Sequence, residues 1–122
     1  MIERKKFEFL VFDVEVVLRE DVPDGFSDSA LGGVYNVPFD DGCVEFKVWF
    51  KGVPAKDAIV HECWHLFMHM MAHVDGGDHT FLELNNEIYA YSFHILYNNI
   101  VSILTNMKLY KKLYDEKYKD ED

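Results

Sequence analysis

The stretch AIVHECWHLF at residues 58–67 holds two histidines one helical turn apart, and Glu62 is its only charged residue. His61 and His65 are four positions apart, and the glutamate directly follows the first of them. In a helix, residues at i and i+4 lie on one face with their Cβ atoms about 5–6 Å apart. The pattern therefore predicts a helix over residues 54–74 whose two imidazoles point in the same direction.

Two imidazoles and a carboxylate in this order are typical of a hydrolytic zinc site. Histidine nitrogens bind Zn²⁺ at about 2.0–2.1 Å, and the glutamate beside the first histidine can act as a general base. The rest of this helix is largely apolar, and a buried carboxylate or imidazole without a partner is costly. The pattern therefore predicts Zn²⁺ held by His61 and His65, with Glu62 as the catalytic base; a chance match is the alternative.

Two further histidines continue the series on the same helix. His69 and His73 extend the four-residue spacing, but each step of four advances about 40° around the helix, so the four rings form a slanting stripe. An imidazolium near the C-terminal end of a helix is favourable. We therefore interpret these two histidines as helix-end or supporting residues rather than as direct ligands.

A hydrolytic zinc ion needs a third protein ligand. The candidates that follow the pentad are His69, His73, Asp75, Asp78, His79, Glu83, Glu87 and His94. A second helix is the favoured source, because it must pack against the first to bury its apolar face. Polar side chains share one side of that helix at about 100° per residue, namely Glu83, Glu87, Tyr91, His94 and Asn98. A solvated helix face is the alternative explanation of this band.

The composition sets limits on partners and compartment. The net charge of −10 argues against binding to nucleic acid, because that needs Lys and Arg to neutralise phosphate. No stretch reaches the roughly 18 uncharged residues of a membrane span, and no signal peptide is evident, so we expect a cytoplasmic protein that does not bind membranes. In that compartment Cys43 and Cys63 are expected to be buried free thiols.

The N-terminal part of the chain has the pattern of strands and loops. The whole chain, residues 1–122, is long enough for a single domain with a modest core. Within residues 1–52, alternating apolar residues predict strands over 6–19, near 34–37 and over 43–50. The last of these has the clearest alternation.

The C-terminal part has the pattern of helices. The motif helix over 54–74 ends before Gly76 and Gly77. Further helices are expected over 80–116, opened by Thr80 and Glu83 as a capping box, and residues 117–122 form a polar tail. We therefore expect an α+β fold, in which a small antiparallel or mixed sheet of two to four strands packs on two or three C-terminal helices that carry the metal site.

The motif also resembles a known family. His61-Glu62-x-x-His65 followed by Glu87-Ile88-Tyr89-Ala90-Tyr91 is similar to the gluzincin branch of the zinc metallopeptidases, and especially to the short HExxH proteins of phages and their bacterial hosts. The resemblance covers about residues 44–98. It implies a minimal zincin-like fold, with Glu87 as the third zinc ligand and Glu62 as the base. Tyr89 and Tyr91 both match the tyrosine of the family motif.

The expected function is hydrolysis of a peptide or amide bond by metal-activated water, with Glu62 as general base and a peptide or protein as substrate. Tyr91 and His94 are candidate donors to the oxyanion, and the open edge of the 43–50 strand is expected to align an extended peptide. The alternative is a non-catalytic metal-binding or interaction protein with a vestigial zincin site. A third reading is an acidic inhibitor that imitates nucleic acid.

Overall fold

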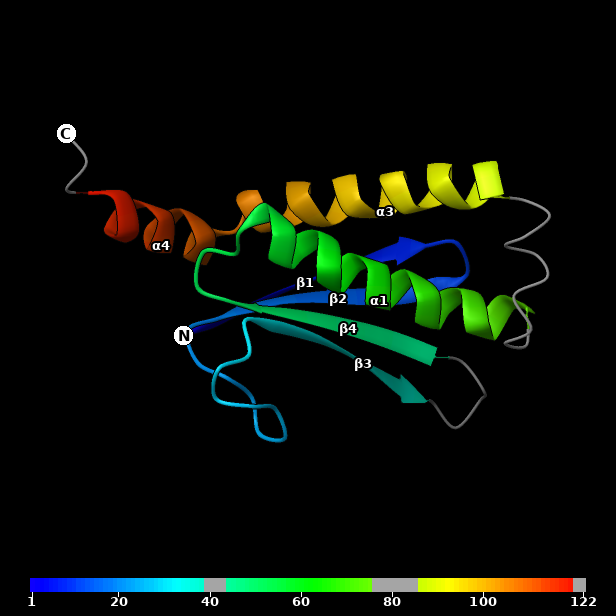
Figure 1. The fold of residues 1–122 in the computed structure, drawn as a ribbon. Helices are drawn as coiled ribbons and strands as arrows, with labels where there is room; N and C mark the ends of the chain where they lie inside the picture. The colour runs from blue at the N-terminus through cyan, green and yellow to red at the C-terminus, as the bar shows by residue number, and fades with distance from the viewer. Residues whose placement is uncertain (39–43, 76–85, 120–122) are drawn as a thin grey trace.

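The computed structural model describes residues 1–38, 44–75 and 86–119 of the chain. It is an α+β protein with a four-stranded mixed sheet in the N-terminal half and, in the described part, three helices in the C-terminal half, which confirms the expected class. The helices lie together over one face of the sheet (Figure 1).

The seven described elements follow one another with the strands first. They are β1 (Ile2–Phe9), β2 (Phe12–Arg19), β3 (Gly32–Pro38), β4 (Val44–Lys51), α1 (Lys56–Asp75), α3 (Asn86–Thr105) and α4 (Lys108–Tyr118). The strand order is β1-β2-β4-β3. β1 and β2 are antiparallel, β2 and β4 are parallel, and β3 and β4 are antiparallel.

The predicted single strand over residues 6–19 is wrong, because the chain reverses within it. Phe9 pairs with Phe12, so Leu10 and Val11 form a two-residue hairpin turn between β1 and β2. Leu10 has a positive φ of 56°, a conformation that usually belongs to glycine or asparagine. The turn carries neither residue type, which is why the alternating pattern looked continuous.

The expectation that the 43–50 strand has an open edge is also wrong. β4 occupies this segment, but it lies between β2 and β3 and pairs with both. Every second side chain of β4 faces the helices, and the side chains between them face the outer side of the sheet. An open edge belongs instead to β3, which pairs only with β4 within the described residues.

The core lies between the inner face of the sheet and the helices. The sheet contributes three cross-strand pairs of buried side chains, Val14 with Phe46, Val16 with Val48 and Leu18 with Phe50. The helices contribute Ile59, Cys63, Leu66, Phe67, Met70, Leu96, Ile100 and Leu104. Cys63 is a buried free thiol, as expected, and its burial raises the pKa of that thiol to about 12. Cys43 lies outside the described residues.

Within the described residues, ion pairs rather than a second layer of helices cover the outer face of the sheet. Buried Glu15 lies 3.2 Å from a guanidinium nitrogen of Arg4 and 3.6 Å from the Nζ atom of Lys47, and Lys6 approaches Glu45 at 3.3 Å. The cationic groups offset the charge of the two buried carboxylates, and their aliphatic stems cover the strands. Glu15 and Glu45 are therefore paired within the sheet.

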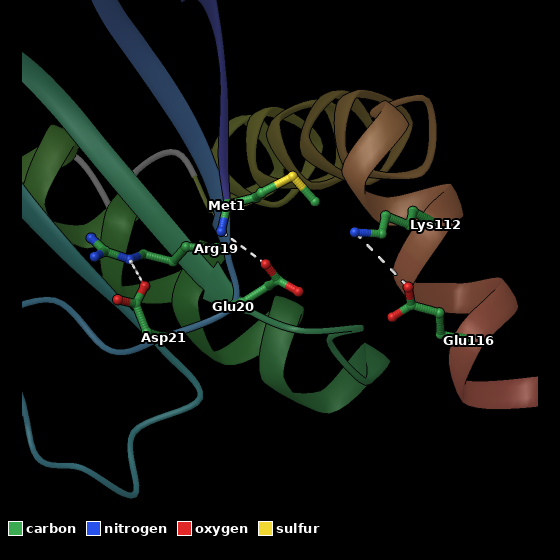
Figure 2. A network of polar contacts seen from close by, with 6 residues as sticks. All are labelled: Met1, Arg19, Glu20, Asp21, Lys112 and Glu116. Atoms are coloured by element: carbon green, nitrogen blue, oxygen red, sulfur yellow. Dashed lines mark hydrogen bonds and ion pairs between the residues drawn. The ribbon is translucent and has the colours of Figure 1, made fainter.

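The N-terminus of the chain, which precedes β1, lies beside α4, as Figure 2 shows. The N-terminal ammonium of Met1 lies 2.8 Å from Glu20, and this contact lowers the pKa of that carboxyl group. Arg19 pairs with Asp21 nearby, and Lys112 pairs with Glu116 along α4. Because exposed ion pairs contribute little, docking of α4 depends more on Leu109, which is buried, and on its backbone N–H, which donates to Glu3 at 2.8 Å.

Replacing Glu3 by Ala should loosen α4. The carboxylate of Glu3 accepts a hydrogen bond from the first turn of α4, where Met107 provides no side-chain cap. Loss of such a cap costs about 1 kcal/mol. We expect a lower urea midpoint and faster amide exchange in α4, whereas Glu8→Ala, the same change at an exposed position of β1, should have neither effect.

Replacing Leu10 by Asn should stabilise the protein. Asparagine tolerates a positive φ better than leucine, for which this conformation costs roughly 1–2 kcal/mol. Thermal unfolding of Leu10→Asn and of the neighbouring Val11→Asn provides a matched comparison, because Val11 is 87% exposed and has no positive φ. Equal melting temperatures in the two variants would contradict a strained turn.

Candidate metal centre

The packing of α1 decides where its polar side chains point. Ile59, Cys63, Leu66 and Met70 recur at helical spacing and are all buried against the sheet. His61 and His65 therefore lie on the outer side of the helix, where both are exposed. Pro54 precedes the helix and Asp57 lies in its first turn, which suits the positive end of the helix dipole.

The two imidazoles of the pentad converge. The Nε2 atoms of His61 and His65 are 3.1 Å apart, with ring centroids 4.6 Å apart and ring planes at 78°. Two nitrogens bound tetrahedrally to one zinc ion at about 2.05 Å are roughly 3.3 Å apart. Without a metal, one ring can donate a hydrogen bond to the other at the same separation. The pair therefore fits two adjacent positions around a single cation.

Glu62 lies beside this pair but is turned toward the sheet. Its side chain is only 12% exposed, and its Oε1 atom is 3.9 Å from the Nε2 atom of His61. Burial raises the pKa of the Glu62 carboxyl group, while positive charge on His61 and His65 lowers it. The position of Glu62 beside the histidine pair suits the role that the motif predicts.

Gly32 is a functional candidate that the sequence did not reveal. A Cβ atom at this position would lie 3.0 Å from the Cγ atom of Glu62 and 3.0 Å from the carbonyl oxygen of Trp49. The missing side chain therefore provides the room in which Glu62 packs against the first residue of β3. The pair Gly32-Gly33 was the only sequence signal for this contact, and such a pair is equally typical of a loop.

α3 packs on α1 through aromatic side chains at the level of the pentad. Trp64 meets Phe93 edge-on at 5.4 Å, and Phe67 meets Tyr89 at 5.6 Å and Phe93 at 5.8 Å. These contacts set both the rotation of α3 and its position along α1. Phe93 therefore contacts the residue of α1 that directly precedes His65.

Glu87 does not join the histidine pair in this arrangement. It is exposed, it lies about 160° around the helix from Tyr89, and it is about 9 Å along the axis from Phe93. Tyr91 and His94 are exposed as well, and the Nε2 atom of His94 lies 3.1 Å from the amide nitrogen of Asn98. All four described members of the polar band on α3, Glu87, Tyr91, His94 and Asn98, are therefore exposed.

The other candidate ligands fall into two groups. His73 packs edge-on against Phe46 at 5.6 Å and against Phe12 at 6.4 Å, and His69 is exposed one turn earlier. Asp78, His79 and Glu83 lie outside the described residues, as does the side chain of Asp75. Within the described part of the chain, no three His, Cys, Asp or Glu side chains come close enough to hold one metal ion. Among the described residues, the structure therefore brings together the pair His61 and His65, with Glu62 beside it, and no third ligand joins them.

Comparison with known proteins adds no relatives. No family model, curated protein or solved structure matches this chain. None of the helices in the described ranges is long and apolar enough to cross a membrane.

Replacing Glu62 by Gln should stabilise the metal-free protein near neutral pH. The pKa of this carboxyl group is raised in the folded state, so its charged form destabilises the fold as pH rises above about 4.5 and has no such effect at lower pH. We expect a gain on the order of 1 kcal/mol, measured by urea unfolding in EDTA at pH 7.5 and absent at pH 4. Glu116→Gln, at an exposed position of α4, is the control, and a loss of stability in Glu62→Gln would contradict the burial cost.

Proposed function

We propose that this protein is a zinc-dependent, peptidase-like hydrolase of the zincin type. The observation that carries the proposal is the 3.1 Å separation of the His61 and His65 Nε2 atoms, with the Glu62 carboxylate recessed beside them. The order of these residues on one helical turn is the order that metal-assisted hydrolysis needs. Zinc bound there would supply a Lewis acid that polarises the substrate carbonyl and acidifies water.

The chain's own residues have separate roles in this proposal. His61 and His65 would hold the metal. Glu62 would accept a proton from the attacking water and then deliver it to the amine that leaves. Tyr91 and His94 remain the candidate donors to the oxyanion, both of them with exposed side chains on α3.

The third ligand is proposed to be a carboxylate that follows the pentad. The family resemblance favours Glu87, and Glu83 is the alternative. Because Glu87 is exposed and turned away from Tyr89, its use as a ligand requires α3 to rotate or shift when metal binds. Variants at the two positions separate these carboxylates directly.

The substrate is proposed to be an extended peptide that adds to the edge of β3, which no other strand of the described ranges occupies. Strand addition gives affinity through backbone hydrogen bonds. Gly32, at the start of β3, lies against Glu62. A peptide paired with this strand would therefore pass close to the proposed base.

The second candidate function is a metal-binding or interaction protein without turnover. It is favoured by the finding that the described residues provide no group of three ligands. An exposed two-histidine site can bind a cation weakly and use it to attach a partner that supplies further ligands. Glu62→Gln distinguishes the two functions, because only the hydrolase depends on this carboxylate.

Metal analysis of purified variants tests the proposal. Wild-type protein should retain about one zinc ion per chain, and His61→Ala and His65→Ala should lose it. Either Glu87→Ala or Glu83→Ala should also lose it, whereas Glu116→Ala should not. Glu62→Gln should keep the metal and lose hydrolysis of a denatured protein substrate by about 10²–10⁴-fold.

The possible results separate the functions. Metal retained in both His61→Ala and His65→Ala would overturn the zinc site. Metal bound stoichiometrically by the wild type, with no hydrolysis that depends on Glu62, would favour the interaction protein.

A further inference from the structure

One face of α3 carries large apolar side chains that are open to solvent. Ile88 is 55% exposed, Tyr91 is 69% exposed and Ile95 is 38% exposed. These residues are three and four positions apart, so they lie within an arc of about 60° around the helix. α3 lies at the outside of the helical layer, with α1 beside it (Figure 1). We call Ile88, Tyr91 and Ile95 the apolar stripe of α3.

A small cavity adjoins one side of the stripe. Its volume is about 210 Å³, and it is lined by Leu10, Met71, Val74, Ile88, Tyr89 and Ser92. Leu10 and Val74 are also exposed, so the apolar surface continues from α3 onto the hairpin and α1. Leu10 extends this surface although its positive φ disfavours a leucine. An exposed apolar surface shared by several elements marks an interaction site, whereas scattered apolar residues do not.

The other side of the stripe is polar. Glu87, His94 and Asn98 lie there, within about 40° of one another, and all three are exposed. The amide nitrogen of Asn98 lies 3.1 Å from the Nε2 atom of His94. Because an amide nitrogen only donates, Nε2 accepts this hydrogen bond and the ring proton lies on Nδ1. Glu87 is about 10 Å from His94 along the helix axis, so the two side chains of one chain do not meet.

We propose that the apolar stripe is the interface of a symmetric homodimer in which two α3 helices pack antiparallel. Apolar residues spaced three and four apart form the seam between paired helices. In a two-fold symmetric pair, the same surface patch meets itself. This inference goes beyond the proposed function, and it requires no metal ion.

The two sides of the stripe determine the direction of the helices. In an antiparallel pair, each side of the stripe lies against the same side in the other copy. The apolar cavity then faces its own equivalent, and the polar side faces the polar side. A parallel pair would instead place the polar side of one copy against the apolar side of the other, where its groups would be buried without partners.

The polar side is complementary to itself in the antiparallel pair. With the two-fold axis beside Tyr91, Ile88 lies opposite the second copy's Ile95, and Glu87 lies near the second copy's His94. The carboxylate of one copy accepts a hydrogen bond from the Nδ1–H group of the other, and symmetry makes this contact twice. The dimer therefore uses Glu87 in the exposed position where the structure places it.

The dimer is expected to be weak. Each copy has a net charge of −10, so two copies repel one another outside the uncharged stripe. A contact through one helix face and the adjoining cavity is also smaller than a standard interface of about 800 Å² per partner. A dissociation constant on the order of 10–100 µM follows.

Sedimentation velocity in EDTA, from about 1 to 500 µM protein, tests the interface. We expect a reversible equilibrium between monomer and dimer. Ile95→Glu should weaken association by at least about tenfold, because it places a charge in the apolar seam. Leu31→Glu is the matched control, since Leu31 is an apolar residue that is 62% exposed but precedes β3. It should leave the dissociation constant unchanged, and circular dichroism should show that both variants fold.

An exchange of Glu87 and His94 tests the antiparallel arrangement. Glu87→Lys removes the acceptor, and His94→Glu sets two carboxylates opposite each other, so each variant should weaken the dimer by roughly threefold or more. The double variant should regain most of the lost affinity, because the lysine at position 87 then meets the glutamate at position 94 of the other copy. Within one chain these positions are too far apart for such a recovery.

The outcomes are distinct from those of the metal analysis. A wild type that stays monomeric at about 500 µM, or equal weakening by Ile95→Glu and Leu31→Glu, would overturn the second copy as the partner of the stripe. Weakening in both single variants without recovery in the double variant would overturn the antiparallel pair. Failure to bind zinc would overturn the proposed function alone, because association is measured in EDTA.

Discussion

The buried face of α1 is the constraint on which the rest of the structure depends. Ile59, Cys63, Leu66 and Met70 must meet the inner face of the sheet, and this requirement fixes the rotation of the helix about its axis. Once that rotation is set, the two histidines of the pentad point outward. Glu62, between the buried and exposed sides, is directed at β3. The same apolar residues that stabilise the core therefore orient the candidate site.

The periodic elements could be predicted from the sequence, because a periodic pattern reports which face of one element is buried. The alternation from Glu45 to Phe50 and the apolar residues around the pentad correspond to β4 and α1. The hairpin at Leu10 could not be predicted, since its turn carries neither glycine nor asparagine. The contact of Gly32 with Glu62 depends on strand order, and order is set by pairing between distant segments that no local pattern reports.

The histidine pair of the candidate site could also be predicted from a local sequence pattern. His61 and His65 are one turn apart, so local helix geometry alone brings their nitrogens together. The placement of Glu87 depends instead on how α3 is rotated, and that rotation follows from Tyr89, Phe93, Leu96 and Ile100 packing inward. A polar band next to the packed face of α3 and a polar band opposite that face differ by only a fraction of a helical turn. The sequence pattern did not distinguish these two placements.

The order of strands has a consequence during synthesis of the chain. β1 and β2 are joined by a two-residue turn and can pair as soon as they emerge from the ribosome. Their inner face, however, is covered in part by α3 and α4, which come much later in the chain. Until these helices are made, the hairpin displays a row of apolar side chains. Exposed apolar surface of this kind makes a partly folded chain prone to aggregation.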